Sequence, residues 1–461
     1  METIVAISSP QGSGAVALIR LSGSAAIDIA SRAWRGCELH GVASHTAHLG
    51  SITDENGEPI DQCVATVFRA PNSFTGEDTV ELGVHGSPWI QREVVRRLID
   101  LGAKPAGPGD FTRRAFLNGK MDLAQAEGVA DLIAATSRAA QRLAISQLSG
   151  KFSSRLNMLR DQLVSLASLL ELELDFSEED VTFADRTQLI DIANEALAII
   201  DRLVGSYAAG RAFKEGVPVA IAGHPNAGKS TLLNRLLDDD KAIVSDIPGT
   251  TRDLIEDTRE IEGILFRLID TAGLRDTTDR VEKIGIDRAN GAISRAAIVL
   301  WLIDASESRE VVAKRIAETA ERIARLDCHN IILLNKLDLA TTPLPTTADI
   351  RNSQGEPAEI LEISAKTGRN CEVIEHHLAQ TAQKEHNPDA ELIVTNARHY
   401  EALRSGADSL RRAKEGIETG LSADFIAQDI RETLHHLGEL TGAITTDTLL
   451  QTIFTRFCIG K

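Results

Sequence analysis

The chain has 461 residues, which at about 150 residues per domain suggests roughly three folded units. Hydrophobic residues make up 43% and charged residues 25% of the chain, a composition that excludes a disordered or fibrous protein. The 49 Lys+Arg against 67 Asp+Glu leave a formal net charge of -18, so any contact with a nucleic acid must use a local basic patch or a partner.

No apolar run approaches the ~20 residues that span a bilayer, and the first residues lack a basic segment followed by an apolar one. We therefore expect a soluble, cytoplasmic protein with no membrane partner. The five cysteines form no C-x-x-C pair, which indicates neither a disulfide framework nor a zinc site. They are Cys37, Cys63, Cys328, Cys371 and Cys458.

Four segments follow one another along the chain. Residues 1–118 alternate short apolar runs with turn residues and contain a helix-like segment at 89–103, which predicts an α+β domain. From 119 to 212 apolar residues recur at helical spacing and proline is absent, as in a helical domain. Residues 213–382 alternate apolar strands with polar or helical segments, which is typical of a parallel α/β sheet. Helical periodicity returns in 383–461.

Two helical arms on either side of a self-contained α/β unit favour the insertion of that unit into one all-α domain. Two independent helical domains are the alternative. We favour insertion because the last arm would form only a small core by itself. The sequence thus predicts a multidomain protein with three domains in four segments.

The strongest motif is G-H-P-N-A-G-K-S at 223–230, which fits G-x-x-x-x-G-K-[ST] and lies between an apolar strand and a helix. In this P-loop pattern glycines turn backbone N–H groups toward phosphates and Lys229 carries charge to the β and γ groups. The hydroxyl of Ser230 is predicted to ligate Mg²⁺. A chance glycine-rich turn is the alternative, which the flanking strand and helix disfavour.

Three shorter motifs follow a strand each. D-T-A-G places a carboxylate for the Mg²⁺ shell and a glycine N–H for the γ-phosphate. The carboxylate of N-K-L-D can accept two hydrogen bonds from guanine, whereas adenine offers no such pair of donors. S-A-K is predicted to support the base from a loop. The residues are Asp270, Thr271, Ala272 and Gly273; Asn335, Lys336, Leu337 and Asp338; and Ser364, Ala365 and Lys366.

In this order the motifs resemble the Ras-like GTPase superfamily, which implies GTP as the nucleotide. G-T-T-R-D at 249–253 stands where switch I supplies a threonine to Mg²⁺, and Thr251 is the first choice. Ras-type proteins carry a water-orienting glutamine after D-T-A-G, but this chain has Leu274, which cannot hydrogen-bond water. Another polar group, a cation or a partner must therefore organise hydrolysis. Nearby candidates are Glu282, Asp276, Asp279 and Arg275.

A closer resemblance rests on the P-loop, D-I-P-G-T-T-R-D, D-T-A-G-L-R, P-N-S-F-T-G-E-D at 71–78, L-N-G-K-M-D-L-A-Q-A-E at 117–127 and the terminal C-I-G-K. Together these segments resemble the MnmE (TrmE) family of tRNA modification GTPases over essentially the whole chain. The resemblance implies a homodimer joined through N-terminal domains that are similar to folate-binding aminomethyltransferases. It also implies Ras-like G domains that meet across the dimer when GTP and K⁺ are bound.

The same resemblance implies the site residues of the G domain. K⁺ would be held by Asn226, Ser245, Ile247 and Thr250, and Glu282 would orient the attacking water. A cation beside the phosphates neutralises developing charge as an arginine would. Besides the three shorter motifs, the implied GTP contacts are Asn226, Ala227, Gly228, Lys229, Ser230, Thr231, Ser245, Asp246, Ile247, Pro248, Gly249, Thr250 and Thr251.

The resemblance further implies a tetrahydrofolate site made by Arg20, Glu81, Lys120 and Lys461. Such a mixture of cations and a carboxylate suits an anionic glutamate tail and a polar pterin. Cys458 is implied to act in the modification chemistry, as a nucleophile or as an acid. Taken alone, it would be expected to be a small buried hydrophobe.

The implied function is a K⁺-stimulated GTPase that works with an FAD-dependent partner of the MnmG/GidA type, in a heterotetramer or larger complex. It would add an aminomethyl or carboxymethylaminomethyl group to carbon 5 of the wobble uridine of certain tRNAs, from methylene-tetrahydrofolate. One alternative is a GTP-regulated RNA or ribosome assembly factor without modification chemistry, which would need a basic module. Another is a folate-dependent aminomethyl transferase whose GTPase control serves an unrelated purpose. The basic clusters in this chain are modest: Arg92, Arg96 and Arg97, and Arg113 and Arg114.

Overall fold

The computed structural model describes residues 2–175, 186–238, 256–270, 291–340, 350–385, 392–455 and 457–460. The chain divides into two compact units. Unit 1 comprises residues 1–134, 144–198 and 402–461, and unit 2 comprises residues 135–143 and 199–401. The longer segment of unit 2 therefore lies, along the chain, between two segments of unit 1. The predicted domain limits at 118, 212 and 382 stay predictions.

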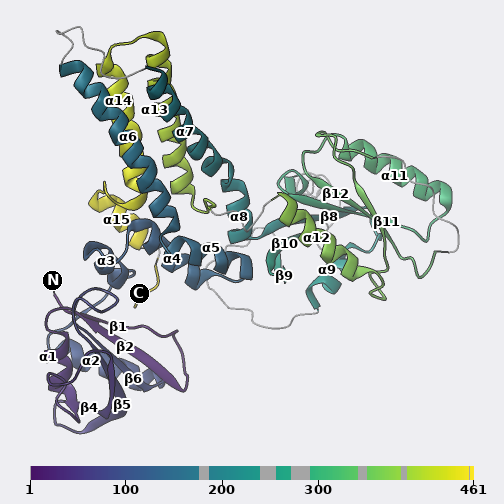
Figure 1. Cartoon of the computed structure of the whole chain (residues 1–461). Coiled ribbons are helices and arrows are strands. Elements are labelled where there is room, and N and C mark those ends of the chain that lie inside the picture. The colour runs from purple at the N-terminus through teal and green to yellow at the C-terminus, as the bar shows by residue number, and fades with distance from the viewer. Residues whose placement is uncertain are drawn as a thin grey trace, which may run out of the picture. The chain divides into compact units, whose positions relative to one another are not determined.

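The N-terminal part of unit 1 is a seven-stranded sheet in the order β3-β4-β5-β6-β2-β1-β7 (Figure 1). Its strands are β1 Ile4–Ile7, β2 Val16–Ser22, β3 Trp34–Arg35, β4 Thr46–Thr53, β5 Pro59–Phe68, β6 Thr79–His85 and β7 Lys104–Pro105. Helices α1, Ala26–Ala33, and α2, Pro88–Asp100, bury their apolar sides against one face of this sheet. Alternate residues of each strand form that core, so the remaining residues line the opposite face. The α+β prediction is confirmed.

The rest of unit 1 is helical, as the 3.6-residue periodicity predicts. Helix α14 packs along α6 (Figure 1). Arg412 of α13 forms an ion pair with Asp429 of α14 at 2.9 Å. Among the residues that the structure describes, no helix is both long and apolar enough to cross a membrane. The helices of this region are α3 Asp110–Leu117, α4 Leu123–Ala134, α5 Arg138–Leu148, α6 Lys151–Asp175, α7 Arg186–Gly205, α13 Ala397–Thr419, α14 Ala423–Thr441 and α15 Asp447–Phe454. Of these, α5, α7 and α13 each have one end in the residues of unit 2.

Unit 2 contains a six-stranded sheet in the order β13-β12-β11-β8-β10-β9. Its strands are β8 Val217–Gly223, β9 Glu256–Ile261, β10 Ile264–Asp270, β11 Ile298–Asp304, β12 His329–Asn335 and β13 Glu359–Glu362. Its helices are α8 Tyr207–Glu215, α9 Lys229–Asp238, α11 Arg309–Ile323 and α12 Cys371–Glu385. Figure 1 shows α11 on one side of the sheet and α9 with α12 on the other.

Both faces of this sheet are covered, which explains why its central strands are continuous apolar runs. In β11, Leu300 belongs to the core under α9 and α12, whereas Trp301 belongs to the core under α11. The predicted α/β class is confirmed. One strand differs from the parallel pattern: β9 pairs antiparallel with β10. Its polar-rich sequence, E-D-T-R-E-I, suits an edge strand, and the apolar-run criterion misses it.

Candidate functional site

The loop between β8 and α9 turns so tightly that it depends on glycine. Gly223 has φ +148°, and a Cβ there would lie 2.4 Å from the carbonyl oxygen of Leu302. Gly228 has φ +101°, and a Cβ would lie 2.3 Å from Nδ2 of Asn335. Between them, Asn226 is exposed and has φ 64°, a conformation that asparagine tolerates better than most residues. The predicted P-loop therefore has the backbone curvature that its motif requires.

Lys229, the first residue of α9, lies across this loop. Its Nζ donates hydrogen bonds to the carbonyl oxygens of Gly223 and His224, both at 2.9 Å. Ser230 and Thr231 follow in the first turn of α9 and are exposed. The N–H groups at the start of a helix, together with an ammonium group, form a site suited to phosphate.

The register of the parallel strands gathers the other predicted motifs at the same edge of the sheet. Asp270 pairs with Ile221 of β8, and Asp304 at the end of β11 pairs with Asn335 at the end of β12. In open α/β sheets ligands bind outside the carboxyl ends of the strands, where these residues lie.

Asn335 joins two of the predicted motifs by its side chain. Its Nδ2 donates to the carbonyl oxygen of Ala227 in the P-loop at 2.8 Å, and its Oδ1 accepts from the backbone N–H of Ala365 at 2.9 Å. The residue is only 2% exposed. Asn335 thus fixes the P-loop relative to the S-A-K loop, a role for which its two-sided amide is suited.

The exposed carboxyl of Asp338 is oriented by Ser364, whose Oγ donates to Oδ1 of Asp338 at 2.6 Å. The S-A-K loop is itself held by Arg235 of α9, whose NH2 donates to the carbonyl oxygen of Lys366 at 3.2 Å. Leu337 donates its backbone N–H to the carbonyl oxygen of Ile363 at 3.1 Å. Hydrogen bonds between the N-K-L-D and S-A-K loops therefore fix the position of the Asp338 carboxylate, which is predicted to recognise the base.

Lys336 is held by a residue that the motifs do not include. Its Nζ lies 2.5 Å from Oδ2 of Asp304. Burial alone would raise the pKa of Asp304, but hydrogen bonds from Lys336 and Ser306 outweigh it and keep this pKa below its ordinary value. Asp304 and Arg235 were missed by motif reasoning. A polar residue at the carboxyl end of a buried strand was the available signal for Asp304.

Several predicted residues lie outside the described part of the chain, and the side chain of Asp270 is not described either. These residues are Ser245, Asp246, Ile247, Pro248, Gly249, Thr250, Thr251, Thr271, Ala272, Gly273, Arg275, Asp276, Asp279, Glu282 and Lys461.

A second cluster lies on the N-terminal sheet, on the face opposite α1 and α2. Arg20 of β2 and Glu81 of β6 are register partners, and their side chains form an ion pair at 2.7 Å. The Arg20 guanidinium carbon lies 5.4 Å from the ring centre of Phe74 and 5.6 Å from that of Phe111. Two aromatic rings around a half-buried ion pair can bind a flat, polar ligand. The two phenylalanines were also missed from the sequence.

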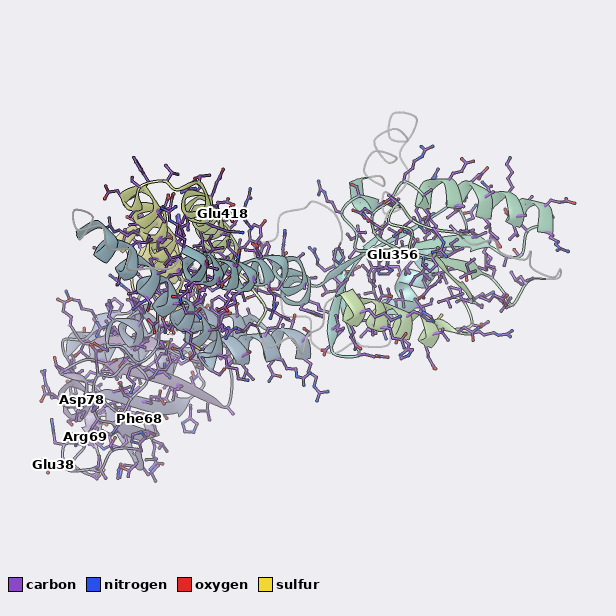
Figure 2. The ribbon with its side chains drawn as sticks, turned by 45° about the horizontal axis from the view of Figure 1, so that its top comes forward. Glu38, Phe68, Arg69, Asp78, Glu356 and Glu418 are labelled. Carbon is purple, nitrogen blue, oxygen red and sulfur yellow. The ribbon has the colours of Figure 1, made fainter. Side chains whose placement is uncertain are left out.

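The loop that carries Phe74 is anchored at both ends, and Figure 2 labels Arg69 and Asp78 there. Arg69 NH2 donates to the carbonyl oxygen of His40 at 2.7 Å, and Asp78 Oδ1 accepts from the backbone N–H of Ala70 at 2.9 Å. Lys120 reaches the same loop, where its Nζ donates to the carbonyl oxygen of Pro71 at 3.0 Å. The loop therefore contacts Lys120 through Pro71 and Arg20 through Phe74.

Cys458 follows α15 in the C-terminal tail. The residue is exposed, unlike the buried Cys63 and Cys371. Its carbonyl oxygen accepts a hydrogen bond from the backbone N–H of Gly109 at 3.4 Å. The expectation of a buried hydrophobe is therefore wrong, because the tail runs over the surface of the N-terminal part.

Comparisons with known proteins extend along the whole chain. Residues 3–120 match the family model described as GTP-binding protein TrmE N-terminus, and residues 123–458 match that of the MnmE helical domain. The protein named tRNA modification GTPase MnmE of Cytophaga hutchinsonii is 47% identical over 460 residues, which cover 100% of this chain and 98% of the relative. Those of Bacteroides thetaiotaomicron and Parabacteroides distasonis are 47% and 46% identical, with 100% of this chain and 99% and 100% of the relatives covered.

Proposed function

The chain belongs to the MnmE family of tRNA modification GTPases, and on that premise we propose how its GTP hydrolysis serves a tRNA substrate. The protein is a GTP hydrolase that takes part in tRNA modification. With an FAD-dependent partner of the MnmG/GidA type, in a heterotetramer or larger complex in the cytoplasm, it adds an aminomethyl or carboxymethylaminomethyl group to carbon 5 of the wobble uridine. Methylene-tetrahydrofolate donates the one-carbon unit.

One observation carries the choice of GTP: the braced carboxylate of Asp338. Since Ser364 occupies one side of Oδ1, the carboxylate is oriented to accept from the N1–H and the exocyclic amine of guanine. Asp338→Asn places a donor where an acceptor stood. This variant should therefore lose binding of GTP and gain binding of xanthosine triphosphate, whose base has an oxygen in place of the amine. Equal loss of both nucleotides would contradict this assignment.

The metal ligands are proposed from the resemblance to the MnmE family. Ser230 and Thr251 would hold Mg²⁺, which when bound neutralises charge on the phosphates. Asn226, with Ser245, Ile247 and Thr250, would hold K⁺, because amide, hydroxyl and carbonyl oxygens suit a hard cation. Glu282 would orient the attacking water, which Leu274 cannot do. Lys229 would transfer its hydrogen bonds from the loop carbonyl oxygens to the phosphates.

The K⁺ assignment is tested by hydrolysis rates in equal concentrations of KCl and NaCl. The wild-type rate should be higher in K⁺, and Asn226→Ala should remove that difference while GTP still binds. Pro248→Ala tests whether the proline stiffens the ion loop through its fixed φ. If Asn226→Ala keeps the full preference for K⁺, Asn226 is not a ligand.

The folate site is proposed at the Arg20–Glu81 pair, with Lys120 and Lys461. The ion pair between half-buried side chains and the two aromatic rings support it. Glu81→Gln keeps the shape of the side chain but removes the charge that holds Arg20. Tetrahydrofolate should therefore bind at least tenfold more weakly, which corresponds to the ~1.5–3 kcal/mol of a charge-assisted hydrogen bond. Glu55→Gln, at an exposed carboxylate elsewhere in the N-terminal part, is the control.

A homodimer is proposed through the face of the N-terminal sheet that lies opposite α1 and α2. Val16 is 70% and Leu49 68% exposed there, and Leu49 pairs in register with Val64, which is 39% exposed. Val64 in turn pairs with Gly83, which leaves a shallow centre between apolar neighbours. Exposed apolar side chains gathered on one face mark an interaction surface. In sedimentation velocity, Leu49→Asp with Val64→Asp should give monomers, whereas Leu421→Asp, at a 50% exposed leucine of the helical part, should not.

The modification itself is tested with the flavin partner, GTP, K⁺, methylene-tetrahydrofolate and tRNA, followed by mass spectrometry of the nucleosides. We expect a modified wobble uridine with the wild type and none with Cys458→Ser. GTP hydrolysis without any modified uridine would favour the assembly-factor alternative. Of the two neighbouring arginines of one basic cluster, Arg114 is 11% exposed and paired with Glu77 at 2.8 Å, so it does not contribute to a free basic surface.

A further inference from the structure

The C-terminal tail is attached to the N-terminal part at three successive residues. Cys458 accepts the Gly109 N–H, Ile459 forms an antiparallel bridge with Pro108, and the Gly460 carbonyl oxygen accepts from Ser8 Oγ at 2.9 Å. Ser8 and Gly460 are 452 residues apart along the chain. A tail held at consecutive backbone positions has a defined place on the surface, unlike most chain ends.

Two glycines allow this close approach. Gly460 has φ +93°, and a Cβ would lie 2.3 Å from the carbonyl oxygen of Ile7. Gly109 has φ +71°, and a Cβ would lie 2.6 Å from the carbonyl oxygen of Phe454 at the end of α15. Both contacts are with backbone, which cannot swing aside as a flexible side chain can. Any side chain at position 460 must therefore push the tail away from the sheet.

Both attachment points adjoin the Arg20–Glu81 cluster. Ala6 of β1 is the register partner of Arg20, and the tail contacts the next two residues, Ile7 and Ser8. On the other side, Gly109 directly precedes α3, which carries Phe111 over the Arg20 guanidinium. The tail therefore runs between β1 and the start of α3, the two elements that border the Arg20–Glu81 cluster.

We propose that Ser8, Gly109 and Gly460 are positioning residues that clamp the C-terminal tail beside the Arg20–Glu81 cluster and so complete the folate site. The clamp sets the place of Cys458 with respect to the bound one-carbon donor. This inference rests on the proposed function of the N-terminal part. It assigns Ser8 and Gly109 a role in one-carbon chemistry although neither belongs to the P-loop or to the terminal motif.

The clamp is tested first by hydrogen–deuterium exchange of the full chain. Loss of one hydrogen bond in Ser8→Ala should speed exchange of the tail peptide and of the Gly109 amide about fivefold. Gly460→Ala should speed both more than tenfold, because its Cβ collides with backbone. Ser8→Thr keeps the hydroxyl and should restore slow exchange. Ser9→Ala is the matched control, since the hydrogen bond that Ser9 Oγ accepts comes from the backbone N–H of Leu18 in β2.

The functional part is tested by equilibrium dialysis with tetrahydrofolate and by the steady-state rate of GTP hydrolysis. Tetrahydrofolate should bind about fivefold more weakly to Ser8→Ala than to the wild type, and Ser8→Thr should keep the wild-type affinity. The KM and kcat of GTP hydrolysis should stay unchanged in every variant. A general structural defect would lower both activities.

The outcomes separate the clamp from the proposed function. Unchanged exchange in both Ser8→Ala and Gly460→Ala overturns the clamp. Faster exchange with unchanged tetrahydrofolate affinity overturns its positioning role. If the wild type binds no tetrahydrofolate, the proposed folate site fails, and the exchange data still decide whether the tail is clamped.

Discussion

Asn335→Ala removes the side chain that links the P-loop to the S-A-K loop. Two buried backbone groups then lose their partners, the Ala227 carbonyl oxygen and the Ala365 N–H. A buried polar group without a partner costs about 1–3 kcal/mol, so we expect a loss of about 3 kcal/mol from the free energy of unfolding of unit 2. The residue is 2% exposed, so solvent relieves little of this cost.

The loss is measured by hydrogen exchange of β12 at increasing urea concentration, which reports the stability of this strand in the full chain. Because the P-loop is no longer braced, GTP should also bind about tenfold more weakly, which corresponds to about 1.4 kcal/mol. A fluorescent GTP analogue measures that affinity.

Asn330→Ala is the matched control on the same strand. Asn330 is 4% exposed and also makes two hydrogen bonds, accepting from Trp301 Nε1 at 2.9 Å and donating to the Cys328 carbonyl oxygen at 2.6 Å. It should cost similar stability without weakening GTP binding. The bridging role of Asn335 is refuted if the two variants weaken GTP binding equally. It is also refuted if Asn335→Ala lowers the free energy of unfolding by less than about 0.5 kcal/mol, which is within the range of an ordinary surface substitution.

Two further predictions concern titration. The folded-state pKa of Asp304 lies below its ordinary value of 3.8, so this group stabilises the fold above pH 3.8 and loses that contribution as pH falls through the lower folded pKa. In urea unfolding, Asp304→Asn should therefore have a lower free energy of unfolding than the wild type at pH 7. This free energy should also decline less at low pH than that of the wild type. An unchanged decline would show that the ion pair of Asp304 with Lys336 is not a cause of the acid sensitivity. Burial, reinforced by the Asp61 carboxylate, raises the pKa of Cys63 to about 12, so iodoacetamide at pH 8.5 should label the exposed Cys37 and spare Cys63 in the native protein. Labelling of both at equal rates, read by peptide mass spectrometry, would contradict this.

Features that depend on residues close together in the chain were open to prediction from the sequence. The strand, P-loop and helix from Val217 to Asp238 follow from an apolar run, two glycines at turning points and a helical period, each of which acts over a few residues. The helices α4, α6 and α7 were predicted for the same reason. The search for apolar runs missed strand β9 because its residues are mostly polar. It becomes a strand by pairing with β10 at the edge of the sheet.

Contacts between distant residues were decided only by the tertiary structure. Asn335 was read as part of a base-recognition motif, but its bond to the P-loop spans 108 residues and exists because β8 and β12 flank β11. Phe74 reaches Arg20 only because its loop is anchored at both ends. The sequence by itself determined which chemical groups this protein carries and the local backbone that presents them. The order of strands in two sheets decided which groups meet, since side chains far apart in the chain interact only where the fold places them within a few ångströms.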